Sequence, residues 1–290
     1  MSRKVYSRKK KSSGFGLIYF VSFLFILLLS FVLASIWQRS EDAAHGITPV
    51  PSSAAEGSAV SEVSDASEAG ESETESQSSA IDYRSFTLVP ELDRVTSDYF
   101  DKAVFIGDSI TEGIKTYGMM TNSTVIAATG INISTITTNQ VIKTAEGRIT
   151  VLDALKQYPD TEKIYILLGA NGIAWIEKDL FIHLYTEFIS AIKEQCPNAL
   201  IYVQSIFPVN EAKFAKNYDS VITNDKIREY NDALLKMSEE LHVYYLNVAE
   251  TIADGDGALS DEATTDGMHI GTAYYEKWFN YLKKHAVPVA

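Results

Sequence analysis

The sequence has a single cysteine, Cys196, among its 290 residues. One thiol cannot form an intrachain disulfide, and it cannot supply the paired cysteines of a zinc ribbon or a redox motif. Cys196 is therefore expected to be a small packing residue. These absences exclude a disulfide-stapled scaffold and a cysteine-rich metal site.

Basic residues are scarce outside the extreme N-terminus. Residues 1–40 hold seven Lys or Arg and no acid, residues 41–100 hold two bases against thirteen acids, and residues 101–290 hold sixteen bases against twenty-five acids. The formal net charge is −13. Because phosphate contacts need clustered Lys and Arg, no nucleic-acid partner is expected.

One long stretch has no charge at all, from Ser12 to Gln38. Its core, residues 14–37, exceeds the roughly 20 apolar residues that cross a bilayer as a helix. The sequence therefore predicts one transmembrane helix over 14–37. The alternative is a cleaved signal peptide with a small-residue site near Ala34, but the apolar run is longer than the usual h-region of roughly 7 to 15 residues.

The charges that flank this helix predict its orientation. Six basic residues precede it, whereas Arg39 follows alone and is soon offset by Glu41 and Asp42. Since positive charge stays inside, the tail 1–13 is expected in the cytoplasm. The rest of the chain is then expected outside the cell membrane.

Aromatic and basic residues are missing from the segment that follows. Residues Glu41–Ala80 contain no aromatic side chain, no Lys and no Arg, but ten Ser and nine acids. Such a segment cannot bury enough apolar surface to offset the entropy of ordering. We expect a disordered Ser-rich acidic linker over 38–80 and one globular domain over 81–290.

The globular domain is expected to be α/β, with a five-stranded parallel sheet in a three-layer α/β/α sandwich. Short, continuously apolar runs alternate with segments that have helical spacing, as in doubly wound sheets. The runs are 103–106, 124–128, 163–168, 200–205 and 243–246, and the helical segments are 150–158, 178–195, 224–241 and 271–285. Sites in such folds form at the carboxyl ends of the strands.

The first such strand runs directly into Gly107-Asp108-Ser109 and a short helix. A serine at this corner is a candidate nucleophile, although it could equally be a helix N-cap. A nucleophilic serine needs a base that accepts its proton and a third group that orients the base.

Five histidines are candidates for that base. His45 lies in the linker, His183 in a long helix, His242 at the start of the last strand and His285 in the C-terminal tail. His269 differs, because Asp266 stands three residues before it in a Gly-containing loop just ahead of the final helix.

These residues resemble the conserved blocks of the SGNH (GDSL-type) hydrolase family. Ser109, Gly130, Asn171 and the pair Asp266 and His269 stand in the order of its four blocks, and the resemblance covers residues 101–285. It implies a flavodoxin-like fold and acyl-ester hydrolysis. Ser109 would be the nucleophile, His269 the general base and Asp266 its orienter, while the amides of Ser109 and Gly130 and the side chain of Asn171 would form the oxyanion hole. It implies neither a metal nor a cofactor.

The chain departs from the family pattern in two places. Gly172 follows Asn171, where the family usually has Asp, so a carboxylate is missing. His269 is followed by Ile-Gly-Thr, which leaves Thr272 as the expected cap of the final helix. His183 and Glu187, one turn apart, are expected to form a surface contact because no third metal ligand is in evidence.

The function expected from the sequence is that of a membrane-anchored, extracytoplasmic serine esterase. An outward-facing domain on a tether meets envelope polysaccharide first, so a short-chain, chiefly acetyl, ester on such a glycan is the expected substrate. Three alternatives remain open: a lipase or lysophospholipase, an acyltransferase, and a non-catalytic glycan-binding module on the same scaffold.

Overall fold

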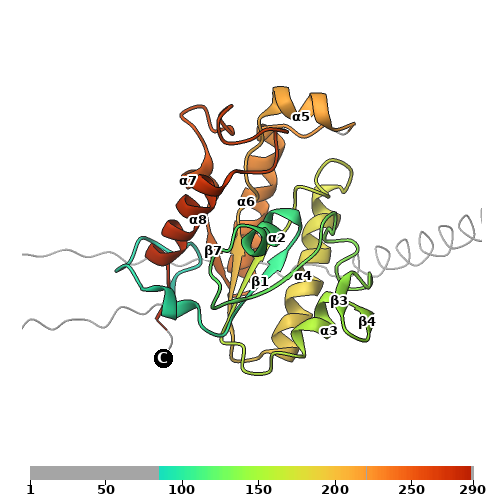
Figure 1. Ribbon diagram of the computed structural model, residues 1–290, viewed down its shortest axis with the longest axis vertical. Coiled ribbons are helices and arrows are strands. Elements are labelled where there is room, and N and C mark those ends of the chain that lie inside the picture. The colour runs from blue at the N-terminus through green and yellow to red at the C-terminus, as the bar shows by residue number, and fades with distance from the viewer. Residues whose placement is uncertain (1–84, 220, 289–290) are drawn as a thin grey trace, which may run out of the picture. The chain divides into compact units, whose positions relative to one another are not determined.

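The computed structural model describes residues 85–219 and 221–288 (Figure 1). The predicted tail 1–13, transmembrane helix 14–37 and linker 38–80 lie outside the described residues. Within the described ranges, no helix combines the length and the apolar character needed to span a membrane.

Five parallel strands form one sheet in the order β2-β1-β5-β6-β7, which confirms the predicted parallel sheet. Each strand matches one of the predicted apolar runs. Their bounds are β1 Ala103–Gly107, β2 Thr124–Ala127, β5 Lys163–Leu167, β6 Leu200–Gln204 and β7 Tyr244–Leu246. His242 does not open β7 as predicted, because it occupies the preceding turn with a φ of 51°.

Helices cover both faces of the sheet, as predicted (Figure 1). On one face, α2 packs on α8, where the Tyr275 hydroxyl donates to the Ile110 carbonyl at 2.6 Å. On the other face, α4 contacts α6. The helices are α2 Ser109–Thr116, α3 Val151–Leu155, α4 Lys178–Gln195, α6 Asn224–Glu240 and α8 Thr272–Lys284.

A ladder of aromatic side chains stiffens the centre of the sheet. Phe105, Tyr165, Tyr202 and Tyr244 are register partners on four adjacent strands. Their rings stack with centroid separations of 4.8, 4.6 and 5.1 Å. Phe279 of α8 closes the ladder edge-on against Phe105 at 5.6 Å. Because stacked rings bury large areas with specific geometry, this ladder fixes the sheet that positions the strand ends.

Several short elements escaped prediction because they contain too few residues for periodicity to show. They are the antiparallel hairpin of β3 (Ile142–Thr144) and β4 (Gly147–Ile149), the helices α5 (Glu211–Asn217) and α7 (Ala249–Ile252), and the 3-10 turn Ser97–Phe100. The prediction for Thr272 is wrong: Gly271 occupies the N-cap, Thr272 is the first helical residue, and no side chain caps α8.

Candidate active site

The corner after β1 is built by Asp108. Its side chain accepts a hydrogen bond from the Ile110 amide at 3.0 Å and caps α2. Ser109 is therefore the first residue of the helix, and the alternative that Ser109 is the cap is wrong. With the cap provided by its neighbour, the Ser109 hydroxyl is free to contact another group.

That group is His269. The Ser109 Oγ lies 2.9 Å from the His269 Nε2, and the His269 Nδ1 lies 2.7 Å from the Asp266 Oδ2. The three side chains that the sequence singled out thus form one hydrogen-bonded row, although 157 positions separate Ser109 from Asp266 along the chain.

The Asp266 carboxylate is held from several sides. Its Oδ1 accepts the amides of Met268 and His269 at 3.0 and 2.9 Å, and its Oδ2 also accepts the Tyr218 hydroxyl at 2.8 Å. Partial burial raises the pKa of Asp266, but the hydrogen bonds from the His269 side chain and from these donors outweigh it and hold the pKa well below its usual range. Asp266 is therefore ionised at neutral pH and can stabilise a positive imidazole.

Gly267 lets the loop between the carboxylate and the imidazole lie flat on α5. Its φ is +99°, and an added Cβ would stand 2.2 Å from the Phe214 amide nitrogen. Any other residue would push the loop away from the helix. Thr264 supports the same turn by accepting the Gly267 amide at 2.9 Å.

Sequence reasoning missed Tyr218, the residue that follows α5. Burial and the neighbouring Asp266 raise the pKa of its hydroxyl, so the hydroxyl stays protonated and donates. Its ring stacks on Phe214 at 4.5 Å. One signal could have revealed the helix that positions it: Asn210, whose side chain accepts the Lys213 amide at 3.0 Å, is a favourable N-cap.

Gly130 lies in the loop that follows the carboxyl end of β2. Gly130 has a φ of +77°, which favours glycine, and nothing lies within 4 Å of the position of a Cβ. Thr129 is fixed by Glu112 of α2, whose Oε2 accepts the Thr129 amide at 3.1 Å and its hydroxyl at 2.7 Å. Glu112 thereby ties the Gly130 loop to the helix that Ser109 begins.

Asn171 follows β5 at the same edge of the sheet, but its amide is already bonded. The Nδ2 donates to the Asp108 Oδ2 at 3.1 Å and to the Ile131 carbonyl at 3.3 Å. Asp108 is 2% exposed, and burial raises its pKa to about 6 despite the hydrogen bond from the Ile110 amide. Donation by Asn171 to a substrate oxygen therefore requires one of its two bonds to be exchanged.

Gly172, which replaces the family's usual Asp, does not need a positive φ. An added Cβ would approach the Ile176 Cδ1 to 3.0 Å, a contact that a small rotation of the Ile176 side chain would relieve. The backbone at this position would therefore allow an Asp.

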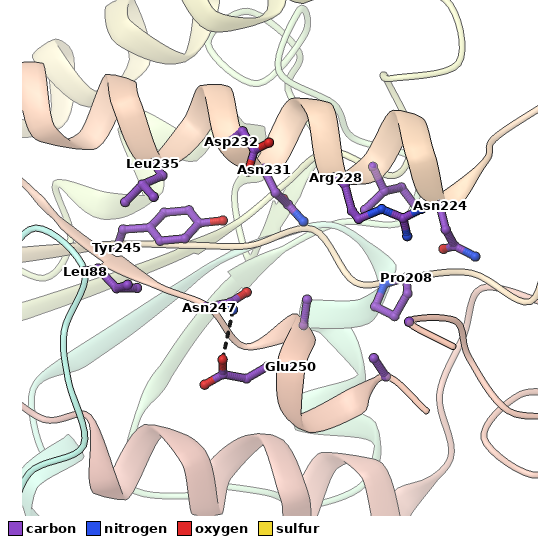
Figure 2. A pocket seen from close by; sticks show the side chains of 14 residues that line it. Leu88, Pro208, Asn224, Arg228, Asn231, Asp232, Leu235, Tyr245, Asn247 and Glu250 are labelled. Carbon is purple, nitrogen blue, oxygen red and sulfur yellow. Dashed lines mark hydrogen bonds between the residues drawn. The ribbon is translucent and has the colours of Figure 1, made fainter. Parts of the chain in front are cut away.

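Two other features lie apart from this row. His183 and Glu187 form an exposed pair at 3.4 Å, and the described ranges hold no group of three potential metal ligands. A pocket of about 360 Å³ opens between α6, the end of β7 and α7, where Asn247 donates to Glu250 at 2.9 Å (Figure 2). Ser109, Asp266 and His269 do not line it.

The fold and the site define an α/β protein with a Ser-His-Asp row at the carboxyl edge of a parallel sheet. The sequence profile of the GDSL-like Lipase/Acylhydrolase family matches residues 105–277, more than half of the chain, so the protein belongs to this family of ester hydrolases.

Solved structures agree with the fold. A Streptococcus pneumonia protein provisionally named a platelet activating factor is 24% identical, covers 64% of this chain and 84% of its own, and superposes with a TM-score of 0.53. A provisionally named acylhydrolase from Bacteroides fragilis NCTC 9343 is 16% identical, covers 67% and 88%, and gives a TM-score of 0.50. No curated protein matched the chain.

Proposed function

We propose that the protein is a membrane-anchored serine esterase that removes short acyl groups, chiefly acetyl, from an envelope polysaccharide. One observation carries the serine-esterase part of the proposal: the Ser109 Oγ, the His269 side chain and the Asp266 carboxylate stand in hydrogen-bonding sequence at 2.9 and 2.7 Å. A serine needs this arrangement of base and orienter to attack an ester.

In the proposed reaction the Ser109 Oγ forms a bond to the ester carbonyl carbon while its proton moves to the His269 Nε2. Negative charge collects on the carbonyl oxygen, where the Ser109 and Gly130 amides and the Asn171 amide are the proposed donors. The C–O bond to the alcohol then breaks, and the alcohol leaves with the proton from His269. Water, deprotonated by the same Nε2, releases the carboxylic acid from Ser109.

Asp266 orients His269 and fixes its tautomer in this reaction. Its Oδ2 accepts the Nδ1–H of His269, which leaves Nε2 as the proton acceptor that faces Ser109. Because the pKa of Asp266 is held low, its negative charge stabilises the imidazolium that forms when the serine proton is taken up.

The substrate and the location rest on the N-terminal sequence. A helix over 14–37 with six basic residues before it would place the domain outside the membrane, on a tether that could reach envelope polysaccharide. Lipid esters and transfer of the acyl group to a sugar hydroxyl are the competing reactions of the same site. A non-catalytic glycan-binding role is disfavoured by the Ser109 to His269 hydrogen bond, since binding does not need it.

The first test uses the full-length chain. We expect hydrolysis of p-nitrophenyl acetate and of acetylated glycans, with rates that fall for longer acyl homologues. Ser109→Ala should lower kcat by roughly 10⁴-fold or more and should abolish labelling by a fluorophosphonate. Ser190→Ala, which alters a serine on α4 that donates to the Thr186 carbonyl, is the matched control and should behave as the wild type. Near-normal activity in Ser109→Ala would refute the serine mechanism.

The anchor has its own test. The intact chain should fractionate with membranes, and a protease added from outside should release the domain by cutting within 38–80. Recovery of a soluble mature form that starts near Ser35 would support the cleaved signal peptide instead.

A further inference from the structure

A pocket of about 400 Å³ lies beside the Gly130 loop, between the end of β2 and the β3–β4 hairpin. Thr129 and Glu112, which hold that loop, form one side of it. The lining also carries three cations, Lys115 at the end of α2, Lys143 on β3 and Arg148 on β4.

These three cations are not paired with other side chains in the described part of the protein. Among the described residues, none of the three takes part in an ion pair or a side-chain hydrogen bond, although the domain from residue 101 onward carries twenty-five acids against sixteen bases. Three unpaired cations around one pocket are therefore a local concentration of positive charge in an otherwise acidic domain.

The hairpin places two of the cations directly opposite each other. Lys143 and Arg148 are register partners on β3 and β4, the two strands of the antiparallel hairpin (Figure 1). Side chains of register partners leave the same face of such a ribbon. Like charges in this position repel and weaken a two-stranded hairpin. An anion bound between them would remove the repulsion, and Arg148 could hold a carboxylate or a phosphate with two hydrogen bonds.

The pocket is also close to the proposed chemistry. Thr129 precedes Gly130, and Glu112 lies one helical turn after Ser109. The Glu112 carboxylate is the one anion on the pocket's lining, and its Oε2 is engaged by the amide and the hydroxyl of Thr129. A group that enters here would therefore be a neighbouring part of the molecule whose ester reaches Ser109.

We propose that Lys115, Lys143 and Arg148 form a subsite for an anionic sugar residue next to the acylated one, so that the substrate is an acyl ester of a carboxylate- or phosphate-bearing glycan. The inference rests on the proposed esterase function and adds the charge of its substrate. The pocket selects for the anion and takes no part in bond breaking.

The test compares three monoacetylated disaccharides that end in glucuronate, glucose 6-phosphate or glucose, which differ only at one carbon of the second ring. With the full-length wild type in low salt, kcat/KM should be at least about tenfold higher for an anionic disaccharide than for the neutral one. The two anionic disaccharides distinguish carboxylate from phosphate. The advantage should appear in KM, with kcat unchanged, and should shrink as salt is added.

The double substitution Lys143→Ala with Arg148→Ala should erase the advantage and leave the neutral disaccharide unaffected. Its thermal midpoint should be no lower than that of the wild type, because the repulsion across the hairpin is gone. Lys236→Ala removes an exposed lysine of α6 and is the matched control, which should keep the preference. Equal kcat/KM for the three disaccharides in the wild type, or equal losses on all three in the double variant, would overturn the inference.

Binding separates this inference from the proposed function. Titration calorimetry of Ser109→Ala with the deacetylated anionic disaccharides should show binding that the added Lys143→Ala and Arg148→Ala substitutions abolish. If this binding occurs but no ester is hydrolysed by the wild type, the subsite stands and the esterase proposal fails. If esters are hydrolysed but the anionic disaccharides do not bind, the subsite is refuted alone.

Discussion

The acid–base side and the oxyanion side of the candidate site differ in how far their hydrogen bonds are already arranged for the proposed reaction. On the acid–base side, Asp266 accepts bonds from His269, Met268 and Tyr218 and fixes the imidazole against Ser109. On the oxyanion side, the Asn171 amide donates inward to Asp108 and Ile131. The proposed base is thus held in place before substrate arrives, whereas Asn171, the proposed oxyanion donor, would have to exchange a partner when charge develops.

The largest effect that tests this contrast comes from Asn171. If its amide moves to the oxyanion, Asn171→Ala should lower kcat by roughly 10²- to 10³-fold, about 3 to 4 kcal/mol, with little change in KM. Steady-state kinetics with p-nitrophenyl acetate provide the measurement. A loss below about threefold would mean that the inward bonds persist and that the donors lie elsewhere.

Gly172→Asp is the companion variant, because it restores the carboxylate usual in the family. Since Gly172 has an ordinary φ and only the Ile176 side chain must give way, the fold should tolerate it. We expect kcat to rise or stay the same. A fall in kcat at normal stability, together with a small effect of Asn171→Ala, would show that groups other than Asn171 stabilise the oxyanion in this protein.

The next effect concerns Asp108, whose pKa of about 6 reflects burial. An unfolded Asp titrates near about 4, so the folded state loses this proton later, and the contribution of Asp108 to the stability of the wild type should fall as pH rises from about 4 to about 6. Asp108→Asn has no such charge. The free energy of unfolding of Asp108→Asn should therefore rise relative to that of the wild type by up to about 3 kcal/mol across this pH window. Urea unfolding at several pH values would measure the difference, and a difference independent of pH would refute the shift.

A smaller effect is expected at Glu112, which ties the Gly130 loop to α2. Glu112→Ala should reduce kcat by about tenfold, because the Gly130 amide would lose its fixed position, while KM changes little. Glu112→Gln keeps an oxygen that can accept both Thr129 bonds and should restore most of the activity. Equal losses in the two variants would show that the charge of Glu112, not its hold on the loop, is what matters.

The smallest effect is expected at Tyr218. Tyr218→Phe removes one of several donors to Asp266 and keeps the ring that stacks on Phe214. Because the His269 Nδ1 and two amides still hold the carboxylate, kcat should fall only severalfold, about 1 kcal/mol. A loss as large as that of Asn171→Ala would mean that the acid–base side depends on Tyr218 and is less complete than its bond count indicates.

The sequence predicted the fold closely where its signal is periodic or continuous. All five strands and the long helices α4, α6 and α8 follow apolar runs or helical spacing that bury against the sheet. It also singled out Ser109, Asp266 and His269, because each stands in a short motif with the right neighbours. The hairpin β3–β4 and the helix α5 could not be predicted, since elements of three to seven residues depend on contacts with distant parts of the chain.

By itself, the sequence determined the candidate residues for the chemistry and showed that Ser109 and Asn171 follow strands of a parallel sheet, whose carboxyl ends all lie at one edge. Only the tertiary structure decided how these residues are partnered. The Tyr218 hydroxyl donates to Asp266, which is 48 positions away in the sequence, and the Asn171 amide donates to Asp108, which is 63 positions away. Lys143 pairs with Arg148 in a hairpin that the hydrophobic periodicity of the sequence does not predict. Hydrogen bonds and charge pairs of this kind depend on distances of a few ångströms between separate elements, and those distances exist only once the chain has packed.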